Sequence, residues 1–130
     1  LAKRDGNTHS LSQFNSITDL KYVVLALKEG KPIGCGAIAM YDFNSMEIKR
    51  MYVSLEVRGQ RIGEKILSEL EEWSRELKSI KCILFTGSRQ PEASQLYQRN
   101  DYFPIEKYGN LKDIPDSLCF AKNLYPYIIK

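Results

Sequence analysis

The fold is decided by residues 46–77, which read MEIKRMYVSLEVRGQRIGEKILSELEEWSREL. Residues 46–54 mix β-branched and aromatic side chains with alternating polar ones, a pattern that predicts a strand. The loop RGQRIG follows at residues 58–63. Apolar residues then recur every three or four positions, which predicts one buried face of a helix. They are Ile62, Ile66, Leu70, Trp73 and Leu77.

The loop at residues 58–63 has the chemistry of an anion site. A helix start carries unpaired backbone N–H groups and the positive end of the helix dipole. Gly59 and Gly63 let a ligand approach the backbone closely. Arg58 and Arg61 add positive charge, so the loop favours a phosphate or pyrophosphate. An ordinary strand-to-helix turn with solvated arginines fits the local sequence about as well.

Length and composition are those of one globular domain. The chain has 130 residues, and 43% of them are hydrophobic, which is enough for a core. No apolar run approaches the roughly 20 residues that cross a bilayer, and no signal peptide pattern opens the chain. The net charge of +3 is weak evidence for a polyanion partner. We therefore expect a cytoplasmic domain without a membrane partner.

The three cysteines, Cys35, Cys82 and Cys119, are far apart in the sequence. None forms a CxxC pair, so neither a metal site nor a disulfide framework is expected. Cys35 and Cys82 lie in apolar runs that read as strands. This usage predicts buried thiols in a reducing compartment.

Two strands are predicted before the central one. Residues 21–28 and 33–42 read as strands on either side of the turn EGKP at residues 29–32, which indicates a hairpin. Gly34 and Gly36 are unusual inside a strand. They indicate a bulge or a place where another backbone approaches closely.

The segments after the long helix add one helix and three strands. Residues 81–86 are a compact apolar run, and a strand reached through a helical crossover should be parallel to the central strand. Residues 87–91 read as a loop, and Pro91 and Glu92 favour the start of a second helix that runs through about Arg99. Residues 102–108 and Ser117–Asn123 read as strands around a loop at residues 109–116.

The predicted order is therefore β-β-β-α-β-α-β-β, an α+β (mixed α/β) layer fold. Ligands in such folds bind at the C-terminal ends of the parallel strands. This rule puts the loop at residues 58–63 at the mouth of a ligand site.

Two separated motifs in this order resemble the GNAT superfamily of N-acetyltransferases, in particular a bacterial subgroup of small enzymes. The family loop pattern Gln/Arg-x-x-Gly-x-Gly/Ala is matched at Arg58 and Gly63, while Arg61 stands where the middle glycine is usual. A second pattern, Asn-x-x-Ala-x-x-Leu-Tyr-x-x-x-Gly-Tyr/Phe, lies in the predicted second helix and just after it. It is matched at Ala93, Leu96, Tyr97 and Tyr102, with Gln90 for the asparagine and Asp101 for the glycine.

The resemblance implies a GNAT-type acyl-CoA fold, with a central mixed, mostly antiparallel sheet flanked by helices. It covers the chain from about residue 21 to the end and makes residues 1–130 a single domain. Residues 1–5 read as the tail of a helix, and residues 6–19 as a loop. The N-terminal strand and part of the first helix of the family are therefore expected to be absent. Family analogy also suggests a homodimer.

By the same resemblance, the chain transfers an acetyl group from acetyl-CoA, as cosubstrate, directly to a primary amine in a ternary complex, without a metal. Loop amides would cradle the pyrophosphate, and the pantetheine arm would pair with the central strand. A splay between that strand and residues 81–86 would expose its backbone. The residues expected to bind the cofactor are Met51, Tyr52, Val53, Arg58, Gly59, Gln60, Arg61, Ile62, Gly63, Glu64, Gln90, Ser94 and Tyr97.

Two residues are candidates for the proton transfers. Tyr97 stands where the family places its general acid, although it also reads as a core aromatic beside Leu96. Glu47 is the candidate base, acting through water, on the strand face that also carries Lys49, Met51 and Val53. A solvated glutamate paired with Lys49 or Arg50 is the alternative. Asp42 and Glu106 are weaker candidates for the base.

The acceptor amine, on a small molecule or a peptide, is expected between residues 6–19 and 109–116. His9, Phe14, Asn15 and Tyr108 are the candidate lining residues. A lone surface histidine is more often inert than catalytic.

Two other function classes compete with an enzyme. A non-catalytic acyl-CoA-binding or sensing domain would keep the loop and tolerate loss of Tyr97 or Glu47. An RNA-binding domain needs a concentrated basic face with stacking aromatics. Here Glu56, Glu64 and Glu69 dilute the arginines, so no nucleic-acid partner is expected.

Overall fold

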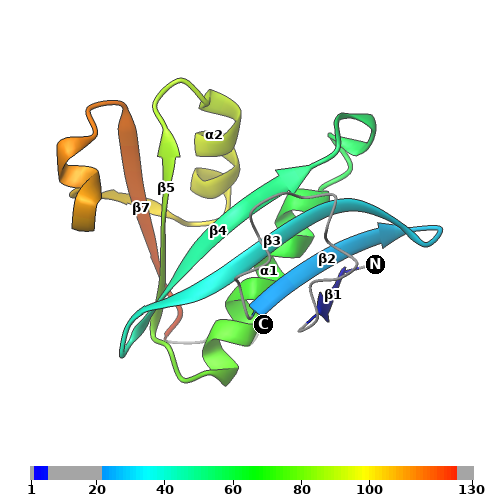
Figure 1. Cartoon of the computed structure of the whole chain (residues 1–130), viewed down its shortest axis with the longest axis horizontal. Helices are drawn as coiled ribbons and strands as arrows, with labels where there is room; N and C mark the ends of the chain where they lie inside the picture. Colours follow the sequence, from blue (N-terminus) through cyan, green and yellow to red (C-terminus); the bar gives the residue numbers. More distant parts are fainter. Residues whose placement is uncertain (1, 6–21, 126–130) are drawn as a thin grey trace.

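A computed structural model describes residues 2–5 and 22–125, and within them seven strands form one sheet in the order β1-β2-β3-β4-β5-β7-β6 (Figure 1). Only β4 and β5 pair in parallel; every other neighbouring pair is antiparallel. The strands are β1 (Ala2–Asp5), β2 (Tyr22–Lys28), β3 (Lys31–Asp42), β4 (Ser45–Val53), β5 (Lys81–Gly87), β6 (Phe103–Ile105) and β7 (Ser117–Asn123). The helices are α1 (Ile62–Glu76) and α2 (Pro91–Arg99), with short 3-10 turns at Leu55–Val57 and Gly109–Asp113. The predicted mixed, mostly antiparallel α+β fold is confirmed.

The predicted elements differ from the structure mainly at the two edges of the sheet. Residues 2–5 are strand β1, paired with β2, and the prediction of a helix tail is wrong. Four residues carry too weak a local signal, and the pairing partner β2 decides their conformation. Strand β6 is limited to Phe103–Ile105 at the opposite edge, where the missing N–H of Pro104 is tolerated. Residues 6–19, which were predicted as a loop, lie outside the described residues.

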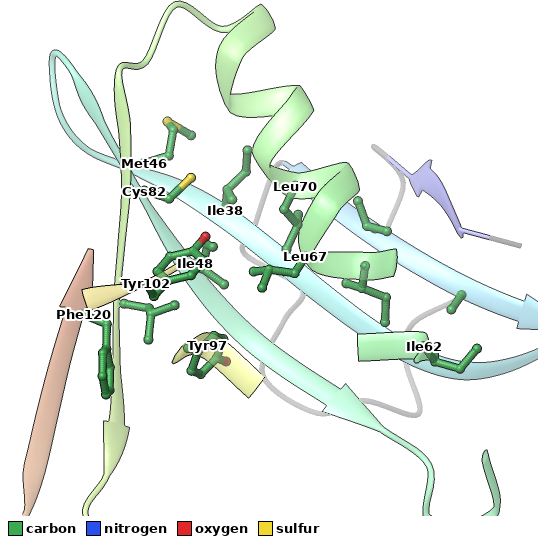
Figure 2. Close-up of a cluster of buried hydrophobic side chains, with 14 of the residues drawn as sticks. Ile38, Met46, Ile48, Ile62, Leu67, Leu70, Cys82, Tyr97, Tyr102 and Phe120 are labelled. Carbon is green, nitrogen blue, oxygen red and sulfur yellow. The ribbon is translucent and has the colours of Figure 1, made fainter. Parts of the chain in front are cut away.

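Helix α1 supplies the centre of the core (Figure 2). Its side chains Ile66 and Leu70 have no exposed surface, and they pack with Ile38 of β3 and Ile48 of β4. The helix lies close because β3 carries glycine beneath it. A Cβ at Gly36 would stand 2.8 Å from Ile66 and 2.9 Å from Leu70. At Gly34 a Cβ would stand 2.9 Å from the Tyr52 backbone oxygen of the neighbouring strand, so the close backbone approach predicted at the strand glycines is confirmed there.

A β-bulge on β4 reverses which side chains face the helices. Lys49 pairs with Ala37 and Tyr52 with Cys35, so two residues of β4 stand opposite one residue of β3. One of them, Arg50, has φ 58°, an unusual value for a residue with a side chain. Before the bulge Met46 and Ile48 contribute to the helix-side core, whereas after it Met51 and Val53 do.

The prediction that Glu47 shares a face with Met51 and Val53 is therefore wrong. Glu47 alternates with Met46 and Ile48 and so lies on the sheet face away from α1. Lys49 lies on the same face as Glu47, as predicted, and its Nζ stands 3.7 Å from the Glu47 carboxylate. The single extra residue of the bulge inverts the alternation that the prediction assumed.

Strands β4 and β5 separate soon after they pair, as Figure 1 shows. Their parallel ladder covers only Ser45↔Lys81, Met46↔Cys82 and Glu47↔Ile83. Strand β4 then continues to Val53 without pairing to β5. The predicted splay is confirmed. It leaves the C-terminal half of β4 facing an opening instead of a neighbouring strand.

The three cysteines are buried and free, as predicted. Burial raises the pKa of Cys35 and of Cys82 to about 11, so both thiols stay protonated at neutral pH. Within residues 2–5 and 22–125, no helix is long and apolar enough to cross a membrane.

Candidate active site

A cleft of about 890 Å³ opens where β4 leaves β5. It lies between the end of β4, the turn into α1 and the helix α2. It is lined by Met51, Tyr52, Val53, Val57, Arg58, Gly59, Arg61, Ile62, Gly63, Glu64, Arg89, Gln90, Pro91, Glu92, Ala93, Gln95, Leu96, Tyr97 and Arg99.

The floor of the cleft is the uncapped start of α1. The N-cap residue Arg61 lies in the left-handed region at φ 61° and makes no side-chain cap hydrogen bond. The bond from Lys65 N to Arg61 O, at 3.2 Å, begins the helix. The N–H groups of the three residues before Lys65 have no partner inside the helix. They provide hydrogen-bond donors and the positive end of a dipole, which is the arrangement that binds phosphate.

The cleft is positively charged, because four arginines outnumber two glutamates among its lining residues. The Arg58 Nε donates to the Val53 carbonyl oxygen at 3.2 Å, which holds its guanidinium beside the end of β4. Arg99 bridges α2 to α1 through Glu64 at 3.1 Å. Arg61 stands 3.7 Å from the same carboxylate. Arginine guanidinium groups match the geometry of phosphate oxygens.

Tyr97 connects the cleft to the core (Figure 2). It is only 6% exposed, and its ring makes an edge contact with Tyr102 at 5.8 Å between centroids. Burial raises the pKa of Tyr97 to about 12, so its hydroxyl is a neutral proton donor at neutral pH. No hydrogen bond joins that hydroxyl to another residue of the described part of the chain.

Glu47 lies on the other face of the sheet and does not line the cleft. Tyr108 donates its hydroxyl to Glu47 Oε2 at 2.6 Å. The ring of Tyr108 also packs edge-on against Tyr41, with 5.1 Å between centroids. Burial, together with the hydrogen bond to the Glu47 carboxylate, raises the pKa of Tyr108 well above its usual range. Glu47 and Tyr108, predicted separately as base and acceptor residue, are thus in direct contact.

Residues 3–102 match the model of the Acetyltransferase (GNAT) family. This match spans well over half of the chain. The chain belongs to the GNAT acetyltransferase family.

Individual relatives agree with this assignment. The IAA acetyltransferase of Azospirillum brasilense is 32% identical over 107 residues, which cover 82% of this chain and 69% of that protein. A Klebsiella pneumoniae protein assigned to the acyl-CoA N-acyltransferases has 27% identity and a TM-score of 0.83 over 96% of this chain and 97% of its own. A GNAT acetyltransferase of Elizabethkingia anophelis, solved with acetyl-CoA bound, has a TM-score of 0.72 at 20% identity, over 92% and 85%.

Most of the cofactor-binding residues predicted for this GNAT chain line the cleft; the exceptions are Gln60 and Ser94. The Gln60 backbone N–H bonds back to Val57 within the turn. The Ser94 hydroxyl is buried and has no hydrogen-bond partner in the described structure. Gln90 lines the cleft and accepts a hydrogen bond from Thr86 at 3.1 Å.

The other predicted residues are more scattered. The weaker base candidates Asp42 and Glu106 are exposed, and the Asp42 carboxylate accepts the Asn44 N–H of the hairpin turn. The predicted acceptor residues His9, Phe14 and Asn15 lie outside the described residues.

Sequence reasoning missed two arginines of the cleft, Arg89 and Arg99. Arg89 precedes α2 and Arg99 ends it. The sequence held a signal for these two arginines, because the second helix was predicted to follow residue 89 and to run through about Arg99, and it carries the second family motif. What the sequence could not show is that α2 packs beside the start of α1, where a Cβ on Gly63 would stand 3.3 Å from Leu96.

The left-handed conformation of Arg61 allows a test that separates its backbone from its charge. A non-glycine residue in this region costs about 1–2 kcal/mol, and part of that is returned when glycine replaces it. Arg61→Gly and Arg61→Ala remove the same charge. We expect the glycine variant to unfold with a free energy about 0.5–1 kcal/mol higher than the alanine variant, as measured by urea denaturation. Equal stability of the two variants would contradict a strained Arg61.

Within the described residues, no three or more His, Cys, Asp or Glu side chains gather in a way that could hold a metal ion.

Proposed function

We propose that this chain transfers the acetyl group of acetyl-CoA to a primary amine, by direct attack of the amine in a ternary complex. The observation that carries the proposal is the cleft. An uncapped helix start and several arginines lie at the point where β4 leaves β5, with a neutral tyrosine in the wall. The acetyl-CoA bound by the Elizabethkingia relative supports this choice of cosubstrate.

The pyrophosphate of the cosubstrate would be held by the backbone N–H groups at the start of α1, with Arg58 and Arg61 adding charge. The pantetheine arm would run along the part of β4 that no longer pairs with β5, near Met51 and Val53. This arrangement brings the thioester to the wall that contains Tyr97.

In the proposed reaction, the amine nitrogen attacks the thioester carbonyl carbon, and the carbon–sulfur bond then breaks. The nitrogen loses a proton to a base, and the CoA thiolate gains one from an acid, so protons and charge balance. Tyr97 would be the acid, because its hydroxyl is protonated and borders the cleft.

Glu47 would be the base, acting through water from the opposite face of the sheet. It is the last residue of β4 that pairs with β5, opposite Ile83, so it lies where the opening between the strands begins. An acceptor amine arriving on that face would meet Glu47 and Tyr108 first, whereas the cosubstrate occupies the helical face. The 13% exposure of the Glu47 side chain leaves it accessible to water.

Acetyl-CoA binding measured by titration calorimetry tests the first half of this proposal. We expect the unmodified chain to bind acetyl-CoA. Binding should be roughly 10- to 100-fold weaker in Arg58→Ala/Arg61→Ala, because the pyrophosphate loses two partly exposed guanidinium partners. Lys28→Ala/Lys31→Ala removes two exposed charges from the β2–β3 hairpin and is the matched control. Equal weakening in both double variants would reduce the effect to general electrostatics and contradict a loop site.

Turnover with a panel of amines tests the second half. Acetyl-CoA binding without acetylation of any amine, under conditions where free CoA release is monitored, would favour the non-catalytic acyl-CoA-binding domain.

A further inference from the structure

A buried polar cluster lies behind Tyr97, outside the cleft. Glu71 of α1 is 6% exposed, and its carboxylate accepts the Tyr102 hydroxyl at 2.8 Å. The Lys122 Nζ of β7 reaches the other carboxylate oxygen at 3.0 Å. Lys122 also stands 5.7 Å from the centre of the Tyr102 ring. The cluster therefore joins α1, β7 and the segment that follows α2.

Tyr102 also takes part in the C-terminal cap of helix α2, and it contacts Tyr97 through both its backbone and its ring. Its backbone N–H donates to the Tyr97 carbonyl oxygen at 3.0 Å, and the Asp101 N–H donates to Gln98 at 3.2 Å. With Asp101 at φ 73°, these two bonds form the motif that closes a helix through a left-handed residue. The hydrophobic contact that accompanies this motif is the Tyr97–Tyr102 ring pair, at 5.8 Å.

The cluster is poorly explained as a device for stability alone. Buried ion pairs rarely stabilise a fold more than well-packed apolar side chains of similar volume, because both charges lose their water. What a hydrogen-bonded pair supplies is a defined position for its partners. Helix α2 has nine residues, too few to hold its shape without tertiary contacts. Its end is held by Tyr102, and Tyr102 is held by Glu71.

We propose that Tyr102, anchored by Glu71 and Lys122, is a positioning residue that holds the Tyr97 hydroxyl at the cleft. The inference rests on the proposed acid role of Tyr97 and extends it to residues that touch neither substrate. Burial keeps the pKa of Tyr102 well above its usual value, so its hydroxyl remains the donor to Glu71. Removing that hydroxyl frees the ring that packs against Tyr97.

The test is a double-mutant cycle on kcat. We expect Tyr102→Phe to lower kcat about 10-fold, with the KM for acetyl-CoA changed less than about twofold, because a misplaced acid affects the chemical step. Added to Tyr97→Phe, the same substitution should lower kcat by less than about twofold, since no acid remains to be misplaced. Glu71→Gln keeps an acceptor for Tyr102 and should lose less than Tyr102→Phe.

Ile38→Val, a truncation in the same core but on β3, controls for lost stability. An equal loss of kcat in this control, or an equal effect of Tyr102→Phe in both backgrounds, would overturn the proposal.

A second measurement does not depend on activity. With 13Cζ-labelled tyrosine, the Tyr97 resonance is assigned by its absence from Tyr97→Phe. We expect Tyr97 to stay protonated at pH 10.5 in the unmodified chain and to begin titrating there in Tyr102→Phe, because its pKa of about 12 depends on burial.

An unchanged Tyr97 titration in folded Tyr102→Phe would also overturn the positioning role. Unchanged kcat in Tyr97→Phe would instead refute the acid role, so the two failures are distinguishable.

Discussion

We expect Tyr97→Phe to lower kcat about 100- to 1,000-fold and to leave acetyl-CoA affinity within about twofold, the range for removal of a general acid when the binding surface is kept. The phenol hydroxyl is the group lost, and the ring that packs against Tyr102 and Phe120 remains. In the proposed reaction, the leaving CoA thiolate would then have to take its proton from water. The measurement is steady-state turnover with an accepted amine, together with calorimetric binding of acetyl-CoA.

The pH dependence that Tyr97 gives to the stability of the unmodified chain has a defined sign. The folded-state pKa of Tyr97, about 12, lies above the ordinary value near 10, because burial disfavours the phenolate. Its contribution to stability is therefore complete below pH 10 and is lost as pH rises through 10 to 12. Because Tyr97 stays protonated below pH 10, we expect it to cause no fall in activity with rising pH in that range. Any such fall in the unmodified chain should persist in Tyr97→Phe.

Tyr22→Phe is the matched control for this prediction. Tyr22 packs edge-on against Trp73 in the same core, at 5.3 Å between centroids, and is not among the cleft residues. It loses the same hydroxyl from a position outside the cleft. A fall in kcat as large in Tyr22→Phe as in Tyr97→Phe would contradict a specific role for Tyr97.

We expect Gly36→Ala to destabilise the fold by about 2 kcal/mol, which is within the range for an overpacked core. The added Cβ would stand 2.7 Å from the Met51 sulfur, 2.8 Å from Ile66 and 2.9 Å from Leu70. The sulfur can move, but Ile66 is branched next to its backbone, so α1 itself must shift. The free energy of unfolding from urea denaturation gives the effect.

Gly87→Ala is the matched control, because Gly87 also lies on a strand but its new Cβ would meet only atoms at 3.9–4.0 Å. We expect it to change stability by less than about 0.5 kcal/mol. A Gly36→Ala protein as stable as Gly87→Ala would show that α1 does not need the glycine. Since α1 begins at the cleft, we also expect Gly36→Ala to weaken acetyl-CoA binding more than Gly87→Ala does.

Local patterns in the sequence were sufficient for most elements of the fold. The bounds of β7 were predicted as observed, and those of α1, α2 and β4 to within about one residue at each end. The cleft position of the loop at residues 58–63 and of Tyr97 followed from the family resemblance, which rests on motifs of about a dozen residues or fewer. Such predictions succeed because helix and strand periodicity, capping and turn chemistry are properties of neighbouring residues.

What the sequence alone determined about this protein is thus the order of its elements from β2 onward, its family resemblance and the loop at the start of α1. Only the tertiary structure decided which face of β4 carries Glu47, because one bulge residue at Arg50 inverts the alternation. It also decided that Glu47 meets Tyr108, sixty-one positions away, and that Glu71 anchors Tyr102 behind Tyr97. These contacts join segments that are distant in the chain, and no local pattern records the register or packing that brings them together.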